Sequence, residues 1–121
     1  TGLNPHAGED GLLGREDEKI IKPAIQNMQK KNIIIDGPLP ADTAFIKKNI
    51  VKYDIILTMY HDQGLPVIKF NDFKKTVNVT LGLPITRVSV DHGTALDLVG
   101  TGKIDISSFL EAIKIAKSIS A

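Results

Sequence analysis

The chain has 121 residues, of which 42% are hydrophobic and 24% charged, and its formal net charge is +1. These values are typical of a globular domain with one modest core, and they exclude the strong electric field that attracts nucleic acid or an anionic membrane surface. The absence of cysteine excludes disulfides and thiolate chemistry, and no apolar run is long enough to span a bilayer. We therefore expect a cytoplasmic protein that binds neither nucleic acid nor membrane.

The chain begins with threonine instead of methionine, and its first residues read as the exit from a strand, so we expect a fragment of a longer chain. Residues 4–11 (NPHAGEDG) are rich in turn-forming residues and contain His6. A lone histidine in a loop is more often structural than functional. His6 therefore becomes a candidate metal ligand only if a second ligand converges on it.

Residues 15–31 have the pattern of a helix, with acidic residues first and lysines last, which complements the helix dipole. Its apolar positions should face the core, and Pro23 must kink or restart it. Residues 32–35 read as a short strand, and residues 41–50 as a helix. Asp42 lies near the start of that helix, where it is either an acid favoured by the helix dipole or a carboxylate of a functional site. The spacing does not separate these two interpretations.

Residues 54–59 form a short apolar run that predicts a buried strand. It ends at His61-Asp62-Gln63-Gly64, and ligands of α/β sheets bind beyond the carboxyl ends of the strands. The same residues also fit a plain loop with a helix cap, with Pro66 at a first helical position. Residues 64–69 read as a short helix or a turn. Taken alone, the motif leaves the role of His61 open.

Residues 76–81 predict a strand carrying Asn78, and residues 87–91 predict another, with Val88 and Val90 on one face. The second strand ends at His92, and a short helix is expected at residues 95–99. A capping box of Ser108 and Glu111 predicts the start of the last helix. The expected core positions of that helix are Phe109, Ile113, Ala116 and Ile119.

The alternation of strands and helices predicts an α/β layer fold. All three histidines lie in or before glycine-containing loops, so the sheet could bring them to one edge, where imidazoles suit zinc, cobalt, nickel or iron. No nucleophile elbow, Walker loop or complete Rossmann fingerprint is present. Lys69, Arg87 and backbone amides are the candidates for binding phosphate or carboxylate groups.

Four segments together resemble one family. They are residues 2–9 (GLNPHAGE), 37–43 (GPLPADT), 59–64 (MYHDQG) and 89–95 (SVDHGTA). In this order they are similar to the C-terminal part of PdxA-type 4-hydroxythreonine-4-phosphate dehydrogenases, over essentially the whole of residues 1–121. The resemblance implies a layered α/β/α fragment of an isocitrate/isopropylmalate dehydrogenase-like fold, from a longer two-domain chain that forms a homodimer with a shared active site.

The resemblance also implies roles for individual residues. His6 and His61 match two of three histidines that bind a divalent metal (zinc, magnesium or cobalt), and the third lies outside this chain. Other matches are Lys69, Asn78 and Arg87 for the small phosphorylated substrate, Asp42 and Asp62 as active-site carboxylates, and His92, Gly93, Thr94 and Asp97 for NAD. The loop after residue 91 is similar to the nucleotide loop of isopropylmalate and isocitrate dehydrogenases, which bind NAD without a Rossmann fingerprint.

The implied reaction is the NAD-dependent oxidation of 4-phosphooxy-L-threonine to a β-keto acid, which loses carbon dioxide to give 3-amino-2-oxopropyl phosphate in pyridoxal 5'-phosphate biosynthesis. Two alternatives stay open. The protein could be a sister dehydrogenase that oxidises 4-phospho-threonate or 4-phospho-erythronate. The 121-residue piece by itself could be an incomplete fragment that only folds and dimerises.

Overall fold

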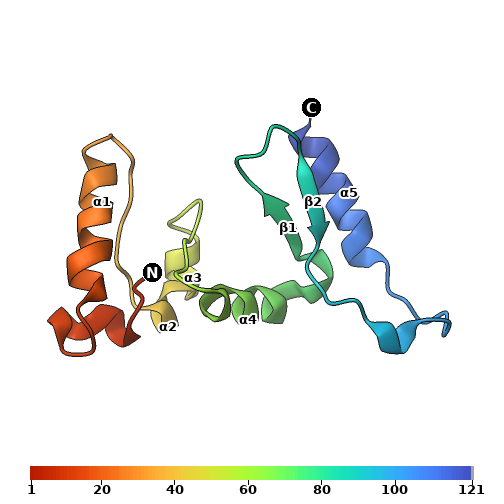
Figure 1. Ribbon diagram of the computed structural model, residues 1–121, viewed down its shortest axis with the longest axis horizontal. Helices are drawn as coiled ribbons and strands as arrows, with labels where there is room; N and C mark the ends of the chain where they lie inside the picture. The colour runs from red at the N-terminus through yellow and green to blue at the C-terminus, as the bar shows by residue number, and fades with distance from the viewer. Residues whose placement is uncertain (121) are drawn as a thin grey trace. The chain divides into compact units, whose positions relative to one another are not determined.

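The computed structural model describes residues 1–120, which divide into two compact units, residues 1–67 and residues 68 onward. The first unit contains η1 (Pro5–Gly11), the π-helical turn η2 (Asp17–Ile21), α1 (Lys22–Gln29), α2 (Ala41–Ala44) and α3 (Lys47–Ile50) (Figure 1). The boundary between the units falls inside α4 (His61–Asp72). The predicted helix at residues 15–31 is thus largely confirmed. Pro23 is the second residue of α1, directly after the π-helical turn η2, so the regular α-helix restarts beside the proline as the sequence predicted.

Two predicted strands of the first unit are wrong. Residues 32–35 and 54–59 form no strand, and Ile34 and Ile55 are 100% and 83% exposed. An apolar β-forming run becomes a strand only when a neighbouring strand accepts its backbone hydrogen bonds, and the described residues of this unit contain none. The histidines are therefore not gathered at the edge of a sheet.

Two helix predictions in the first unit also need correction. The helix expected at residues 41–50 is broken into α2 and α3, because Ile46 is extended (φ −66°, ψ 149°). The helix expected at residues 64–69 begins earlier, at His61, and extends to Asp72. Pro66 therefore lies inside α4 and not at its first position, and it deprives the helix of one backbone donor.

The second unit is a β-hairpin with helices. It contains η3 (Phe73–Lys75), β1 (Val77–Thr80), β2 (Arg87–Val90), η4 (Leu96–Leu98) and α5 (Ser107–Ile119). The two strands are antiparallel, with Val77 opposite Val90 and Thr80 opposite Arg87, so both predicted strands are confirmed. Strand alternation places the four valines on one face and the polar residues Asn78, Thr80, Arg87 and Ser89 on the other.

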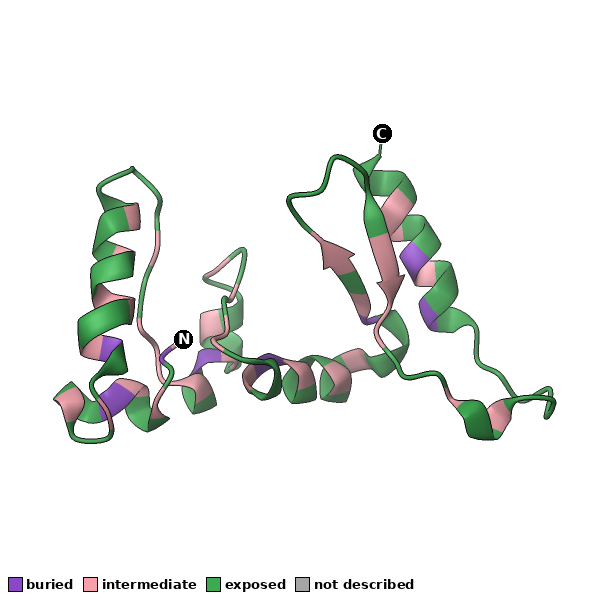
Figure 2. Cartoon of the chain, in the orientation of Figure 1, coloured by how far each residue is buried: buried purple, intermediate pink, exposed green. Residues whose placement is uncertain are grey.

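The helix α5 packs against the hairpin through small residues. Ser108 and Ala112 are buried, whereas Phe109 and Ile113 are more than half exposed, so the predicted core face was wrong (Figure 2). The predicted capping box is absent as well, because Ile106 occupies the N-cap and Ser108 points inward. The hydroxyl of Ser108 donates a hydrogen bond to the carbonyl of Thr76 at 3.2 Å, which ties α5 to the start of β1.

The mixed helix and strand content of the prediction is confirmed. The sheet in the described residues has two antiparallel strands, so this part of the chain alone does not display an α/β/α layering. Between residues 1 and 120, no helix combines the length and the apolar character that crossing a bilayer requires.

Candidate functional site

His6 lies in a segment with an unusual backbone. Residues 6–11 all have positive φ, with His6 at 51° and Glu9 at 42°. Glycine adopts this conformation readily, but each other residue there costs about 1–2 kcal/mol. The predicted turn-rich loop is confirmed, and it holds the histidine in a conformation that persists only when neighbouring contacts impose it.

The buried carboxylate of Asp17 supplies such contacts just before His6. It accepts hydrogen bonds from the backbone N–H groups of Leu3 at 2.8 Å and Asn4 at 3.0 Å, and from the Asn4 side-chain amide at 3.2 Å. Asp17 is fully buried, so these charge-assisted bonds replace its contacts with water. A Cβ at Gly2 would lie 2.7 Å from the Cα of Ala7, so only glycine fits at this position next to Asp17.

Three segments of the first unit meet at Gly2. Its N–H donates to the carbonyl of Leu39 at 2.8 Å, and its carbonyl accepts from the Gln63 amide at 2.7 Å. The amide oxygen of Gln63 also accepts from the Met59 N–H and the Thr1 hydroxyl, both at 2.8 Å. The backbone segments that precede His6, Asp42 and His61 are thereby joined by hydrogen bonds within one compact unit.

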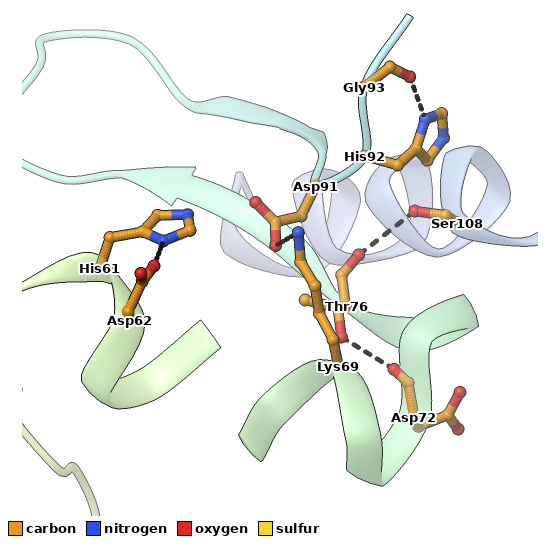
Figure 3. Close-up of polar contacts among 9 residues, drawn as sticks. All are labelled: His61, Asp62, Lys69, Asp72, Thr76, Asp91, His92, Gly93 and Ser108. Carbon is orange, nitrogen blue, oxygen red and sulfur yellow. Dashed lines mark hydrogen bonds and ion pairs between the residues drawn. The ribbon is translucent and has the colours of Figure 1, made fainter. Parts of the chain in front are cut away.

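Both predicted metal-binding histidines pair one ring nitrogen with a carboxylate. The Nδ1 of His6 lies 2.5 Å from Glu9 Oε1, and the Nδ1 of His61 lies 2.6 Å from Asp62 Oδ1 (Figure 3 shows the second pair). In each case the carboxylate favours the tautomer that carries its proton on Nδ1, which leaves Nε2 as a free lone pair. The hydrogen bond and charge of Glu9 raise the pKa of His6, and the charge of Asp42 adds to the effect.

Asp42 lies in the first turn of α2, as the dipole interpretation expects, and its negative charge also contributes to the raised pKa of His6, so both interpretations of Asp42 stay open. No set of three histidine, aspartate or glutamate side chains is grouped as a metal site anywhere in residues 1–120. The assignment of His6 and His61 as metal ligands stays a prediction at this point.

The predicted substrate residues lie in the second unit. Lys69, near the end of α4, has its Nζ 3.5 Å from Asp91 Oδ2, just beyond the end of β2 (Figure 3). Asn78 on β1 and Arg87 on β2 share the polar face of the hairpin. Arg87 donates from Nη1 to the Thr80 hydroxyl at 2.8 Å and lines a hollow of about 250 Å³ beside the hairpin loop. Arg87 and Asp91, the partner of Lys69, thus lie at opposite ends of β2, about 13 Å apart along the chain direction.

The predicted cofactor residues occupy one exposed loop after β2. His92 donates from Nδ1 to the Gly93 carbonyl at 2.9 Å, and Gly93 has open space around the position of a Cβ. Asp97 lies in the first turn of η4, so the predicted short helix at residues 95–99 is a 3₁₀ turn. Thr94 and Asp97 make no hydrogen bond through their side chains within residues 1–120, so both remain accessible to a ligand.

Sequence reasoning missed four residues that organise these side chains: Asp17, Gln63, Glu9 and Asp91. Asp17 looked like an ordinary first-turn acid, and no local pattern indicates that it is buried. Glu9 lies three residues after His6, a spacing that can bring the two side chains together. Gln63 and Asp91 belong to motifs that sequence analysis singled out, but their partners are distant in sequence.

Comparison with known proteins shows that the chain is similar to dehydrogenases. Over 119 residues the chain is 56% identical to a 4-hydroxythreonine-4-phosphate dehydrogenase from Stutzerimonas stutzeri, covering 98% of this chain and 36% of that protein. A relative of the same name from Pseudoalteromonas atlantica is 57% identical over 118 residues, with the same coverage. The chain spans just over a third of the length of these relatives.

Residues 1–116 match the sequence model of the family described as pyridoxal phosphate biosynthetic protein PdxA, and the chain belongs to this family. The solved structure of 4-hydroxythreonine-4-phosphate dehydrogenase from Klebsiella pneumoniae is similar with a TM-score of 0.85 and 44% identity, over 98% of this chain and 36% of that one. A terephthalate 1,2-cis-dihydrodiol dehydrogenase from Burkholderia xenovorans gives a TM-score of 0.63 and 28% identity, over 98% and 37%.

Proposed function

We propose that the full-length protein, meaning the longest polypeptide that this gene encodes, is an NAD- and divalent-metal-dependent dehydrogenase of pyridoxal 5'-phosphate biosynthesis. It oxidises 4-phosphooxy-L-threonine to a β-keto acid that decarboxylates to 3-amino-2-oxopropyl phosphate. Family membership supports this reaction. The observation that carries the proposal is the pair of histidines in one unit, His6 and His61, each with a carboxylate on Nδ1.

The two histidines fit a divalent metal. A metal-binding imidazole commonly donates its other N–H to a carboxylate, and Glu9 and Asp62 are placed to accept it. Two nitrogen ligands favour zinc or cobalt over magnesium, which prefers oxygen. When bound, such an ion acts as a Lewis acid that lowers the pKa of the substrate hydroxyl and so favours hydride loss to NAD.

The carboxylates then take separate roles. Asp62 holds the ring of His61 in one tautomer and orientation, because its carboxylate accepts the Nδ1 proton. Asp42 has no side-chain hydrogen bond within residues 1–120 and is exposed, so it remains free to accept or donate a proton during the reaction.

The residues of the second unit bind the substrate and the cofactor. Lys69 and Arg87 are cations at the two ends of β2, which suits a substrate that carries a carboxylate and a phosphate as separate anionic groups. Asn78, on the same face as Arg87, orients the substrate by hydrogen bonding. His92, Gly93, Thr94 and Asp97 form the loop for NAD, where Asp97 can accept hydrogen bonds from ribose hydroxyls.

The proposal extends to the architecture of the whole protein. Residues 1–121 form the C-terminal part of a two-domain chain with an isocitrate/isopropylmalate dehydrogenase-like α/β/α fold. The protein acts as a homodimer in which both subunits contribute to each active site. The chain spans just over a third of the length of the relatives that it matches. This partial coverage supports the idea that residues outside the chain complete the ligand set.

The test measures NADH formation by the full-length protein with 4-phosphooxy-L-threonine, NAD and zinc, magnesium or cobalt. His61→Ala is expected to abolish turnover and bound metal while the fold persists. His92→Ala is the matched control, because it should keep the metal and raise only the KM for NAD. Full activity of His61→Ala would sink the proposal, and a higher kcat/KM with 4-phospho-threonate would favour the sister reaction instead.

A further inference from the structure

Asp91 carries a buried oxygen atom without a hydrogen bond. Its Oδ2 is the one buried side-chain nitrogen or oxygen of residues 1–120 that lacks a hydrogen-bond partner. A carboxylate oxygen removed from water is costly unless a donor or a cation compensates it. The residue directly follows β2, and no role for it emerged from the sequence pattern. Its retention in this environment therefore calls for a physical explanation.

Lys69 supplies the compensating charge. Its Nζ lies 3.5 Å from Asp91 Oδ2, and its side chain is about two thirds buried (32% exposed). This distance is longer than the 2.7–2.9 Å of a charge-assisted hydrogen bond. The ammonium is therefore attracted to the carboxylate but does not donate a hydrogen bond to it. On another side the Nζ lies 5.9 Å from the centre of the Phe73 ring, within range of a cation–π contact. The ammonium is held in place while its three donors stay available.

The backbone around this pair is fixed as well (Figure 3). The Thr76 hydroxyl donates to the carbonyl of Asp72 at 2.8 Å, and the Thr76 carbonyl accepts from Ser108 at 3.2 Å. The end of α4, the start of β1 and α5 are therefore connected. Because β1 and β2 are paired in register, the backbone at Lys69 is positioned relative to the backbone at Asp91.

We propose that Asp91 is a positioning residue, which holds the ammonium of Lys69 where it binds an anionic group of the substrate. The inference rests on the proposed function in one respect, namely that Lys69 binds that anion. Without Asp91 the flexible lysine side chain samples other rotamers, and binding then includes the entropic cost of ordering it again. If Asp91 instead competes with the substrate for Lys69, its removal should tighten binding of the substrate.

The first test compares the kinetics of the full-length enzyme with Asp91→Asn, Asp91→Glu and a control. Asp91→Asn should raise the KM for 4-phosphooxy-L-threonine about tenfold and change kcat less than about twofold, as expected when a binding interaction worth one power of ten is lost. Asp91→Glu should recover part of the loss. Asp105→Asn removes the partner of another lysine, Lys74, in an exposed ion pair of 2.7 Å, and should leave the KM unchanged.

The second test does not depend on turnover. Titration calorimetry with inorganic phosphate should give a Kd about tenfold higher for Asp91→Asn than for the unmodified protein. In a Lys69→Met background, Asp91→Asn should add nothing, because Asp91 acts through Lys69. An unchanged or tighter Kd in Asp91→Asn, or an equal loss in both backgrounds, overturns the inference. A phosphate Kd that does not respond to Lys69→Met overturns it too, whereas absence of NADH formation alone counts against the proposed reaction.

Discussion

The two units position their functional side chains by different physical means. In residues 1–67, His6 and His61 are carried by irregular segments that Asp17 and Gln63 hold through hydrogen bonds to the backbone. In the second unit, Asn78 and Arg87 are placed by the register of a regular hairpin. A few individual side chains therefore determine the geometry of the first unit, whereas many backbone bonds share that task in the second.

The burial pattern also indicates that polar side chains determine the geometry of the first unit. The fully buried side chain of greatest volume within residues 1–120 is the charged Asp17, and the only hydrophobic residue buried in the first unit is Ala44. Since little apolar surface is buried around the histidines, polar bonds contribute a large share of the local stability. Substitutions at these polar residues test most directly whether the two units are stabilised in different ways.

Asp17→Ala should have the largest effect. It leaves the part-buried backbone N–H groups of Leu3 and Asn4 without their acceptor, and we expect a loss of about 3 kcal/mol in the free energy of unfolding. Bound metal should be lost with the His6 segment. Denaturant unfolding and metal analysis of the full-length protein measure both. Asp54→Ala is the control, since Asp54 lies in the same unit, is exposed and makes no side-chain hydrogen bond or ion pair within residues 1–120, so its removal should change neither quantity.

Gln63→Leu should have the next largest effect. The substitution keeps the volume but removes the bonds to Gly2, Met59 and Thr1, which should cost about 1–3 kcal/mol. Because the bond to Gly2 joins the segments of the two histidines, zinc affinity should also fall about 10–100-fold. Gln29→Leu removes one exposed bond, to the carbonyl of Ile35, and should leave zinc affinity unchanged. Equal zinc affinities in the two variants would contradict the joining role of Gln63.

The secondary structure of the second unit was easier to predict from the sequence than that of the first unit. The strands at residues 77–80 and 87–90 alternate valine with polar residues, and this local pattern is sufficient because the partner strand follows within a few residues. The runs at residues 32–35 and 54–59 have similar composition but find no partner strand in their unit, and propensity alone cannot reveal that.

The candidate functional residues could be identified from sequence motifs, but their long-range contacts could not. His6 and His61 were identified because their motifs resemble a family, not because their spacing indicates a ligand pair. Gln63 was noted as part of a polar motif, but its bond to Gly2 spans 61 positions and depends on tertiary structure. The serine that suggested a capping box, Ser108, instead makes a buried hydrogen bond to the Thr76 carbonyl, because the N-cap of the helix is Ile106, two residues before the serine.

Ser108→Ala tests the regular unit and should have a smaller effect than either substitution above. It removes one buried hydrogen bond, from the Ser108 hydroxyl to the Thr76 carbonyl, so we expect a loss of about 1 kcal/mol with metal binding unchanged. Ser118→Ala is a control on the same helix, where an exposed hydroxyl donates to the Ile115 carbonyl. A loss for Ser108→Ala as large as that for Asp17→Ala would remove the contrast between the units.

The smallest expected effect concerns pH and the exposed residue Asp105. Hydrogen bonds from Lys74 and from Ser107, at the start of α5, hold the pKa of Asp105 well below its ordinary range, and the same pair raises the pKa of Lys74. A carboxyl with a lowered folded-state pKa stabilises the protein above its unfolded pKa of about 3.9, and this contribution is lost as the pH falls toward the folded-state value.

The Tm of Asp105→Asn should therefore lie slightly below that of the unmodified protein between about pH 5 and pH 9, and the two values should converge below about pH 4. Glu111→Gln, which loosens a 3.5 Å pair with Lys114 on α5, is the control and should show no such convergence. Added salt should shrink the Asp105 difference at neutral pH, because exposed charges are screened. A difference that persists unchanged at pH 3 and in high salt would mean that the bonds of Asp105 to the backbone, and not its charge, fix the start of α5.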